Sequence, residues 1–514
     1  MSGPVDAPAL PASSPPPAPA GPSLRVGMAW GTVANLATAV SRLVCSVVVA
    51  RLLDVAGTGA VVYALWLAST GVMIVGLGLP QAMQRFLAEA DGRGDRGTMA
   101  GLARWMARRV AALTLVAVLG IAAAGSWLAD HAGLGSAAPL GALLAIQCLE
   151  ALGSAYLSGC RRFADQARWS LLAACIQIAG VASGAYVAGA SGAVYGYAAG
   201  SLPLALIGLG AAGIRGGSAG LDGELRPRVL RYALVAWIAM LASSFIWSRM
   251  ELFFIARYLG LPEVATYGVA LSWATLVGQV PLMSLGALLP HFAARSGSGD
   301  SADAFRVYTQ ATKLLAMVLA PMCLWAAVLT PVLLPVVYGK SFAMAVPFAM
   351  ILAAGAVVGV AGVGSALLYG MERSSFIIGS SVVGACLATL LAWLVIPTWG
   401  LMGAALMRVG LQATMITIGF WYIAIRLGGR VPVAALAAII GGAAVAALPM
   451  HLLLAWDARW LPLGIAAGVA LYWCCLRCCR ILDGEDVAFI RSIVRPLPRA
   501  AQRLVDIMIP AGRG

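Results

Sequence analysis

The series of apolar runs along this chain limits its fold more than any other feature. From residue 28 to residue 480, runs of about twenty residues recur between short connections, and a helix of that length crosses the hydrocarbon core of a bilayer. Charged residues make up 11% of the chain, whereas a soluble protein has roughly a quarter. Because a spanning segment must satisfy its own backbone hydrogen bonds, we predict an all-α polytopic membrane protein.

The runs divide into about fourteen transmembrane helices in two lobes of six, with two more at the end. We expect the N-lobe at 26–214, the C-lobe at 229–426 and the two extra helices at 431–480. Residues 1–25, rich in Pro and Ala, are predicted to be a disordered cytoplasmic tail, and residues 481–514 a basic amphipathic one. The predicted spans are 28–52, 56–80, 109–129, 135–159, 168–188, 192–213, 231–256, 264–290, 311–337, 344–369, 375–396, 401–425, 432–455 and 460–480.

Basic residues are distributed unevenly over the connections between these spans. If the N-terminus is cytoplasmic, the outer connections hold only Arg51, Arg257, Lys340 and Arg459. All other basic residues outside the spans then lie on the inner side. The positive-inside rule therefore predicts that both termini are cytoplasmic. The net charge of +14 is a topology signal, and we expect no nucleic-acid partner.

Two flanking segments have the pattern of basic amphipathic helices. Residues 99–110 set Leu102 and Met106 against Arg104 and Arg108, and the tail 487–505 mixes isoleucine and valine with arginine. Such helices lie in the membrane interface when one leaflet is anionic. We therefore expect anionic lipids as partners of both segments.

The residues that commonly support catalysis or metal binding are sparse and scattered. The only histidines, His131, His291 and His451, lie near span ends, and no nucleophile or acid/base pair can be assembled. The cysteine cluster at 474–479 has C-x-x-C spacings but no second ligand pair nearby. We predict no metal site, no cofactor and no enzymatic activity; a membrane-embedded glycan enzyme is the less favoured alternative.

A repeated phrase indicates that the two lobes are related. Residues 47–67 (VVVARLLDVAGTGAVVYALWL) parallel residues 252–273 (LFFIARYLGLPEVATYGVALSW), six spans later and in the same orientation. In each copy a span ends in Ala-Arg-x-Leu, a short acidic turn follows, and the next span opens near a tyrosine. Parallel repeats of six helices are a transporter architecture with the binding site between the halves.

Three motifs resemble a known family. They are similar, in order and spacing, to patterns of oligosaccharide flippases and polysaccharide transporters. The three segments are ARLLDVAGTGAVVYAL (50–65), VVYGKSFAMAVPFAMILAAG (336–355) and IPTWGLMGAAL (396–406). This is the polysaccharide branch of the multidrug/oligosaccharidyl-lipid/polysaccharide exporters, and the resemblance covers about 28–425. Asp54 stands where that family usually has glycine, and Glu251 where aspartate is common.

The resemblance implies two six-helix lobes around a central cavity and a function for the chain. The expected substrate is an undecaprenyl-pyrophosphate-linked oligosaccharide, flipped across the bacterial inner membrane for surface polysaccharide synthesis such as O-antigen or exopolysaccharide. The polysaccharide polymerase and export machinery are candidate partners. The two extra helices also occur in lipid II flippases, so lipid II is an alternative substrate.

Five ionisable residues lie inside the predicted spans, namely Arg42, Glu150, Arg249, Glu251 and Arg408. An arginine at the centre of a membrane helix costs about 2.5–3.5 kcal/mol, so each must face a water-filled cavity or a partner. Arg42 and Arg249 lie eight or nine residues before their span ends, about 12–13 Å deep, on equivalent helices of the two lobes.

Two roles remain open for these charges. Guanidinium groups on both sides of a cavity could grip a pyrophosphate bidentately, and we predict Arg42, Arg249 and Arg408 as substrate-binding residues. Alternatively they are internal ion-pair partners, Glu150 with Arg42 and Glu251 with Arg408. The two glutamates could also bind a coupling proton or sodium ion.

Uncharged polar residues within spans form a second candidate set. They could meet sugar hydroxyl groups in the cavity or bond between helices. These residues are Asn35, Gln147, Gln177, Gln279 and Gln412. A multidrug/cation antiporter of the same superfamily would need acidic cavity residues, and we rank it below a flippase because arginines outnumber glutamates.

Overall fold

The computed structural model describes residues 24–213, 223, 225–282, 301–371, 373–479, 484 and 486. The predicted tails at 1–25 and 481–514 therefore lie almost entirely outside the described residues. The described part contains helices and no strand. The predicted all-α polytopic class is confirmed.

The first half of the chain folds into long helices that run back and forth. Short connections separate these helices, and some of them are polar, such as residues 93–95 and 160–162. The helices are α1 (Leu24–Leu52), α2 (Val55–Gly76), α3 (Leu79–Gly92), α4 (Arg96–Ala132), α5 (Ala138–Gly159) and α6 (Phe163–Gly213).

The second half continues in the same way, with one 3-10 segment, η2, at the start of the predicted tenth span and another, η3, inside it. Its helices are α7 (Leu225–Trp247), α8 (Glu251–Tyr258), α9 (Leu261–Leu282), α11 (Ser301–Tyr338), η2 (Lys340–Ala345), α12 (Val346–Gly355), η3 (Ala356–Ala361), α13 (Gly362–Gly370) and α14 (Ser374–Arg426). The last pair of helices is α15 (Val433–Trp456) and α16 (Leu461–Cys478), joined by η4 (Ala458–Trp460).

Helices α6 and α14 each contain two of the predicted spans. Gly189 (φ 60°, ψ −139°) interrupts α6, and Gly400 (φ 57°, ψ −141°) interrupts α14 in nearly the same conformation. Beyond the first interruption the chain packs back on itself, since a Cβ on Gly196 would lie 2.4 Å from the backbone of Gly180. Among the described residues, eleven helices are long and apolar enough to cross a membrane. Counting both arms of these two helices brings the described fold close to the fourteen predicted spans.

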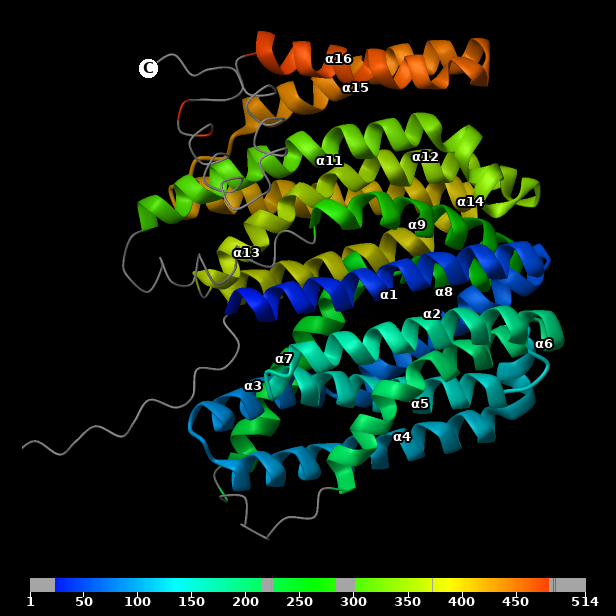
Figure 1. The fold of residues 1–514 in the computed structure, drawn as a ribbon, viewed down its shortest axis with the longest axis vertical. Helices are drawn as coiled ribbons and strands as arrows, with labels where there is room; N and C mark the ends of the chain where they lie inside the picture. Colours follow the sequence, from blue (N-terminus) through cyan, green and yellow to red (C-terminus); the bar gives the residue numbers. More distant parts are fainter. Residues whose placement is uncertain are drawn as a thin grey trace, which may run out of the picture.

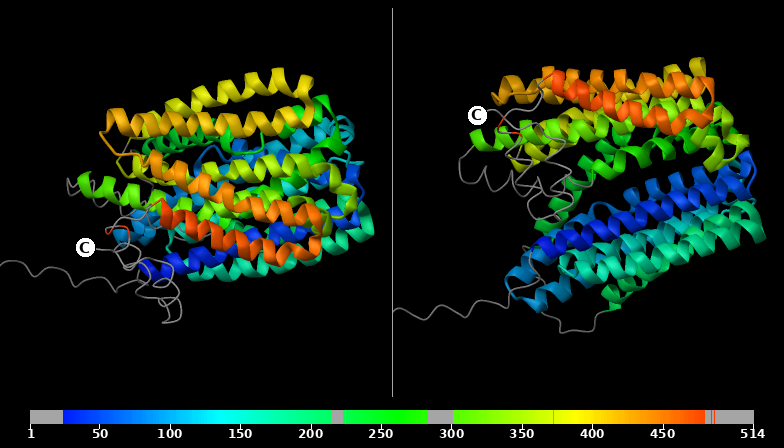
Figure 2. Two further views of the ribbon diagram at one scale, coloured as in Figure 1. Left: turned by 90° about the horizontal axis from the view of Figure 1, so that it is seen from above. Right: turned by 45° about the horizontal axis from the view of Figure 1, so that its top comes forward.

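The two halves of the chain form two bundles that lie side by side. Figures 1 and 2 show α4, α5 and α6 in one bundle and α11, α14, α15 and α16 in the other, with α1 near the middle. Helices α15 and α16 pack on α11, where the Trp325 indole donates to the carbonyl of Ala443 and the Tyr472 hydroxyl to that of Met317. We call the end of the bundles that carries the arginine-rich connections the basic end.

Opposite the basic end, the two bundles are in close contact. Helix α2 meets the start of α9, where a Cβ on Gly59 would lie 1.9 Å from the carbonyl oxygen of Leu261. Arg51, at the end of α1, donates to the carbonyl groups of Val336 and Val337 at the end of α11. The large buried cluster around these contacts draws residues from both halves. This end of the molecule is closed.

Near the basic end, α7 connects the two bundles. Its first half packs on α2 and α3, where the Trp237 indole donates to the Met73 carbonyl at 3.0 Å. Its last turn packs on α14, where Ile246 contacts Gly384 and Met415. The predicted C-lobe, 229–426, includes most of this helix, whereas in the structure α7 contacts helices of both bundles.

The amphipathic segment 99–110 does not lie alone on a lipid surface. It forms the first turns of the long helix α4, and Leu102, Met106 and Val110 are buried. They belong to one core cluster with Met83 and Phe86 of α3. The expectation that this apolar face contacts lipid was wrong, because a period of 3.6 residues marks a buried face without identifying what covers it.

Asp54 explains one departure from the family pattern. Its carboxylate accepts a hydrogen bond from the backbone N–H of Gly57 at 2.8 Å, so it caps the amino terminus of α2. We expect Asp54→Ala to lower the free energy of unfolding by about 1 kcal/mol, and Asp54→Gly by only a few tenths. Thermal unfolding of the detergent-solubilised protein measures this, and equal effects of the two substitutions would contradict the capping role.

Candidate functional site

The helix that carries Arg249 is broken within the membrane. The predicted span 231–256 is wrong in this respect, since α7 ends at Trp247 and α8 begins at Glu251. The break leaves the last carbonyl groups of α7 without helical partners. Irregular backbone at membrane depth is stable only where protein or a water-filled cavity satisfies it. Transporters use such breaks to build binding sites.

Arg408 and Gln412, one turn apart on α14, satisfy these carbonyl groups. The Arg408 guanidinium donates to Ser248 at 2.7 Å and to Trp247 at 3.2 Å. The Gln412 amide lies 3.5 Å from the carbonyl oxygen of Ile246. Cations and donors at a helix C-terminus also interact favourably with its dipole. Helix α14 therefore holds the broken end of α7 in place.

The same guanidinium forms an ion pair with Glu251, the first residue of α8. Glu251 is 4% exposed and also accepts a hydrogen bond from the Tyr267 hydroxyl at 3.0 Å. A buried carboxylate needs such partners, because desolvation of an unpaired charge is costly. Arg408 thus joins both sides of the break, which is one of the two roles considered for it.

Arg249 lies in the break itself, close to charges from both halves of the chain. Its guanidinium interacts electrostatically with Arg42 of α1, Arg408 of α14, Glu251 and the Tyr197 hydroxyl of α6. We call Arg42, Arg249 and Arg408 the arginine centre. Mutual repulsion of three cations favours binding of an anion among them.

The other glutamate, Glu150, lies on α5 in the N-terminal half of the chain. Its carboxylate accepts a hydrogen bond from the Ser201 hydroxyl and interacts electrostatically with Arg42. Glu150 and Arg42 therefore influence each other electrostatically, but no direct salt bridge joins them among the described residues. Three arginines and two glutamates leave the centre with a net positive charge.

The uncharged polar candidates are not gathered in one place. Gln177 of α6 accepts a hydrogen bond from Ser41, next to Arg42, at 3.0 Å, and Gln412 lies beside Arg408. Gln147 is half-buried on α5, while Asn35 and Gln279 are exposed on α1 and α9. Gln177 thus contacts the chain neighbour of Arg42, and Gln412 contacts the broken end of α7.

Two tyrosines belong to the site and were not singled out from the sequence. Tyr267 is fully buried against Glu251, and Tyr197 lies near Arg249. A signal for Tyr267 existed, because it is the tyrosine that opens the second span of the repeat. Tyr63 is its counterpart in the first copy, and it stacks on Trp66 instead.

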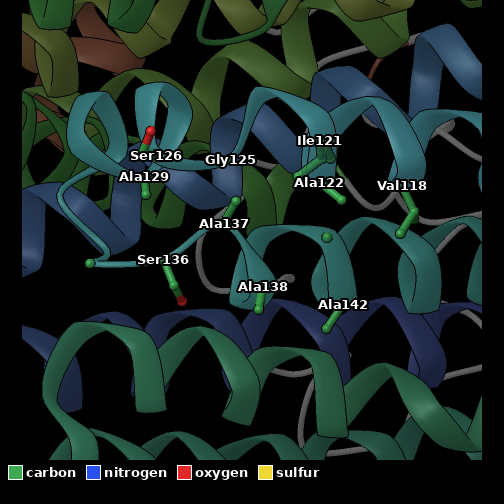
Figure 3. Close-up of a pocket in the computed structure, with 12 residues that line it drawn as sticks. Val118, Ile121, Ala122, Gly125, Ser126, Ala129, Ser136, Ala137, Ala138 and Ala142 are labelled. Atoms are coloured by element: carbon green, nitrogen blue, oxygen red, sulfur yellow. The ribbon is translucent and has the colours of Figure 1, made fainter.

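A separate groove lies between α4 and α5, away from the arginine centre. It has a volume of about 620 Å³, and Val118 and Ala122 of α4 line it together with Ala138 and Ala142 of α5 (Figure 3). The interruption of α4 at Gly125 lies in its wall. None of the predicted site residues lines this groove.

Several solved structures share this fold. A lipid II flippase, MurJ, in an inward closed conformation is 12% identical with a TM-score of 0.66, and the match covers 91% of this chain and 99% of that one. An inward-facing multidrug resistance MATE family transporter of the MOP superfamily is 16% identical with a TM-score of 0.61, covering 76% and 94%. An outward-facing MATE family transporter gives 17% identity and a TM-score of 0.54, covering 78% and 94%.

Sequence comparison identifies the family. No curated protein matches the chain. Residues 48–347, more than half of the chain, match the family model described as polysaccharide biosynthesis protein. The matched segment includes the Ala-Arg-x-Leu repeat, Glu150, the broken helix and Glu251. The chain is therefore a multi-pass membrane protein that belongs to the polysaccharide biosynthesis protein family and has the fold of flippases and transporters of the MOP superfamily.

Proposed function

We propose that this protein flips a lipid-linked oligosaccharide, carried on undecaprenyl pyrophosphate, across the bacterial inner membrane by alternating access. The basic end lies in the cytoplasm, as do both termini. The pyrophosphate meets the arginine centre while the prenyl chain stays in lipid. The protein acts as a transporter and catalyses no reaction.

The observation that carries this proposal is the arginine centre at a broken membrane helix. Arg42 and Arg249 come from different halves of the chain, so an anion between them would contact both of the halves that move relative to each other in alternating access. Arginine suits a pyrophosphate, since its planar fork can donate two parallel hydrogen bonds. The contacts opposite the basic end close the outer side, which is the state expected to receive substrate from the cytoplasm.

The membrane potential can drive this direction of transport. Two negative charges moved outward through about 150 mV gain roughly 7 kcal/mol, at about 2.3 kcal/mol per charge per 100 mV. Glu150, which has no salt bridge among the described residues, is the better candidate for a coupling proton or sodium ion. Glu251 is engaged by Arg408 and Tyr267.

Lipid II is the second candidate substrate, because it carries the same pyrophosphate. The structural match to the lipid II flippase covers 91% of this chain, so it extends beyond residues 28–425. The two substrates differ in the intermediate that accumulates when the protein is lost. A cation antiporter fits less well, since the centre carries a net positive charge.

We expect Arg42→Ala and Arg249→Ala each to lower transport at least about tenfold, because a hydrogen bond to a charged group contributes about 1.5–3 kcal/mol. The measurement is complementation of a deletion strain, with the undecaprenyl-linked sugar on the cytoplasmic face quantified. Arg249→Lys, which keeps the charge without the fork, should retain more activity than Arg249→Ala.

Arg257→Ala is the matched control, since it removes an exposed arginine near the end of α8. Full transport by stably inserted Arg42→Ala and Arg249→Ala would refute the binding role of the centre. Accumulation of lipid II alone would assign the second substrate, and export of cationic dyes without any lipid-linked intermediate would favour the antiporter.

A further inference from the structure

A second group of arginines lies at the basic end, where α3 meets α7. An open pocket of about 470 Å³ is lined by seven residues of these two helices. They are Arg85, Phe86, Pro227, Arg228, Arg231, Tyr232 and Val235. We call it the α3–α7 pocket. It is separate from the arginine centre, which lies beyond the other end of α7.

The packing of the aromatic rings positions these guanidinium groups. Arg85 lies over the Tyr232 ring at 4.4 Å, and Phe86 packs edge-on against the same ring with centroids 5.7 Å apart. Arg228 lies 5.5 Å from the Phe86 ring. Stacking on rings holds an arginine fork in place while leaving its edge free to donate.

The pocket keeps a net positive charge. Glu89 pairs with Arg228 at 3.3 Å and with Arg93 at the same distance. Arg85 and Arg231 form no ion pair with any residue of the described part of the chain, and both are exposed. Two guanidinium groups from different helices therefore remain available to one anion.

Below these arginines, α7 presents an apolar stripe. Leu230, Leu234 and Ile238 follow one another at helical spacing and are 43%, 51% and 44% exposed. Val235, 51% exposed, joins the stripe to the pocket wall. A ligand seated here would place an anionic group among the arginines and hydrocarbon along α7.

We infer that the α3–α7 pocket binds the phosphate of a lipid whose hydrocarbon chain lies along this stripe. The charges fit phosphate, and the continuity of the pocket with the apolar stripe fits a lipid better than a free anion. Helix α7 also contacts α14, so a bound lipid would sit on the helix that bridges the two bundles. The inference requires only that the basic end lie at a membrane surface, and it stands whether or not the protein flips an oligosaccharide.

The test is the affinity of the full-length protein in detergent micelles for fluorescent phosphatidylglycerol. We expect Arg85→Ala with Arg231→Ala to weaken binding about 25-fold, since each arginine near such a surface contributes about fivefold. Arg231→Ala alone, which breaks no described contact of α3 with α7, should weaken it about fivefold. Arg373→Ala is the matched control, an exposed arginine of another connection at the basic end, and should leave the affinity unchanged.

Competition distinguishes the sources of the phosphate. Displacement by farnesyl pyrophosphate at lower concentration than by unlabelled phosphatidylglycerol would assign the pocket to the prenyl-linked substrate, and equal displacement to membrane lipid; both support a lipid phosphate site. Inorganic pyrophosphate competing as well as either lipid would overturn the inference. A loss of affinity in Arg373→Ala equal to that in Arg231→Ala would also overturn it, because binding would then depend on the general surface charge and not on the pocket.

Discussion

Arg408→Ala is expected to destabilise the protein by about 3–5 kcal/mol, the usual cost of removing one partner of a buried ion pair. Glu251 would keep a buried charge with only the Tyr267 hydroxyl as a described side-chain partner. The carbonyl groups of Trp247 and Ser248 would also lose their donor. Transport should fall with the folded population. Thermal unfolding of the detergent-solubilised protein measures the loss.

A double-mutant cycle separates the ion pair from the contacts to the broken helix. Glu251→Gln in the Arg408→Ala background should restore part of the stability, because the stranded charge is removed. The carbonyl groups would remain unsatisfied, so recovery should be incomplete. Gln412→Ala, one turn away, is a milder control whose contact with Ile246 is longer. Wild-type stability of Arg408→Ala would exclude the role given to this arginine.

Gly59→Val is expected to disfavour closure of the outer end and so to lower transport. A side chain there would meet the backbone carbonyl of Leu261, which cannot rotate away. Overpacking of this kind costs about 1–3 kcal/mol, and the cost applies only to the state in which α2 and α9 touch. The ratio of outer-closed to outer-open molecules should therefore fall by roughly 5- to 150-fold.

Accessibility of a cysteine at Asn35, in a cysteine-free background, reports this shift. With the outer end open and the basic end closed, labelling from the cytoplasmic side should decrease. Gly120→Val on α4 is the matched control, since a Cβ there has no neighbour within 4 Å. Normal transport by Gly59→Val would show that the contact between α2 and α9 does not belong to the transport cycle.

Local sequence properties predicted most of the spans, but not the break within the span 231–256. Apolar length identifies a membrane helix because the bilayer core has a fixed thickness. In the structure α6 and α14 are interrupted at Gly189 and Gly400, between predicted spans, since a backbone with φ near 60° suits glycine. The repeat identified Arg42 and Arg249 as equivalent, and both lie in the candidate site.

The break between α7 and α8 could not be predicted in the same way. The residues Ser248, Arg249 and Met250 include no proline or glycine, and the apolar pattern continues across them. The break is stable because Arg408 and Gln412, about 160 residues further along the chain, bond its carbonyl groups. Such a non-local partner has no local sequence signature.

The sequence by itself determined that the chain is a polytopic helical membrane protein with two related halves and arginines within its apolar spans. These properties depend on length, hydropathy and charge, which act locally against the bilayer. Only the tertiary structure decided that Arg408 pairs with Glu251 and that Arg249 interacts with two other arginines. It also decided that residues 99–110 contact α3. Each of these outcomes depends on which side chains meet across helices. The sequence shows that an apolar face or a charge needs a partner, but it does not show which residue is that partner.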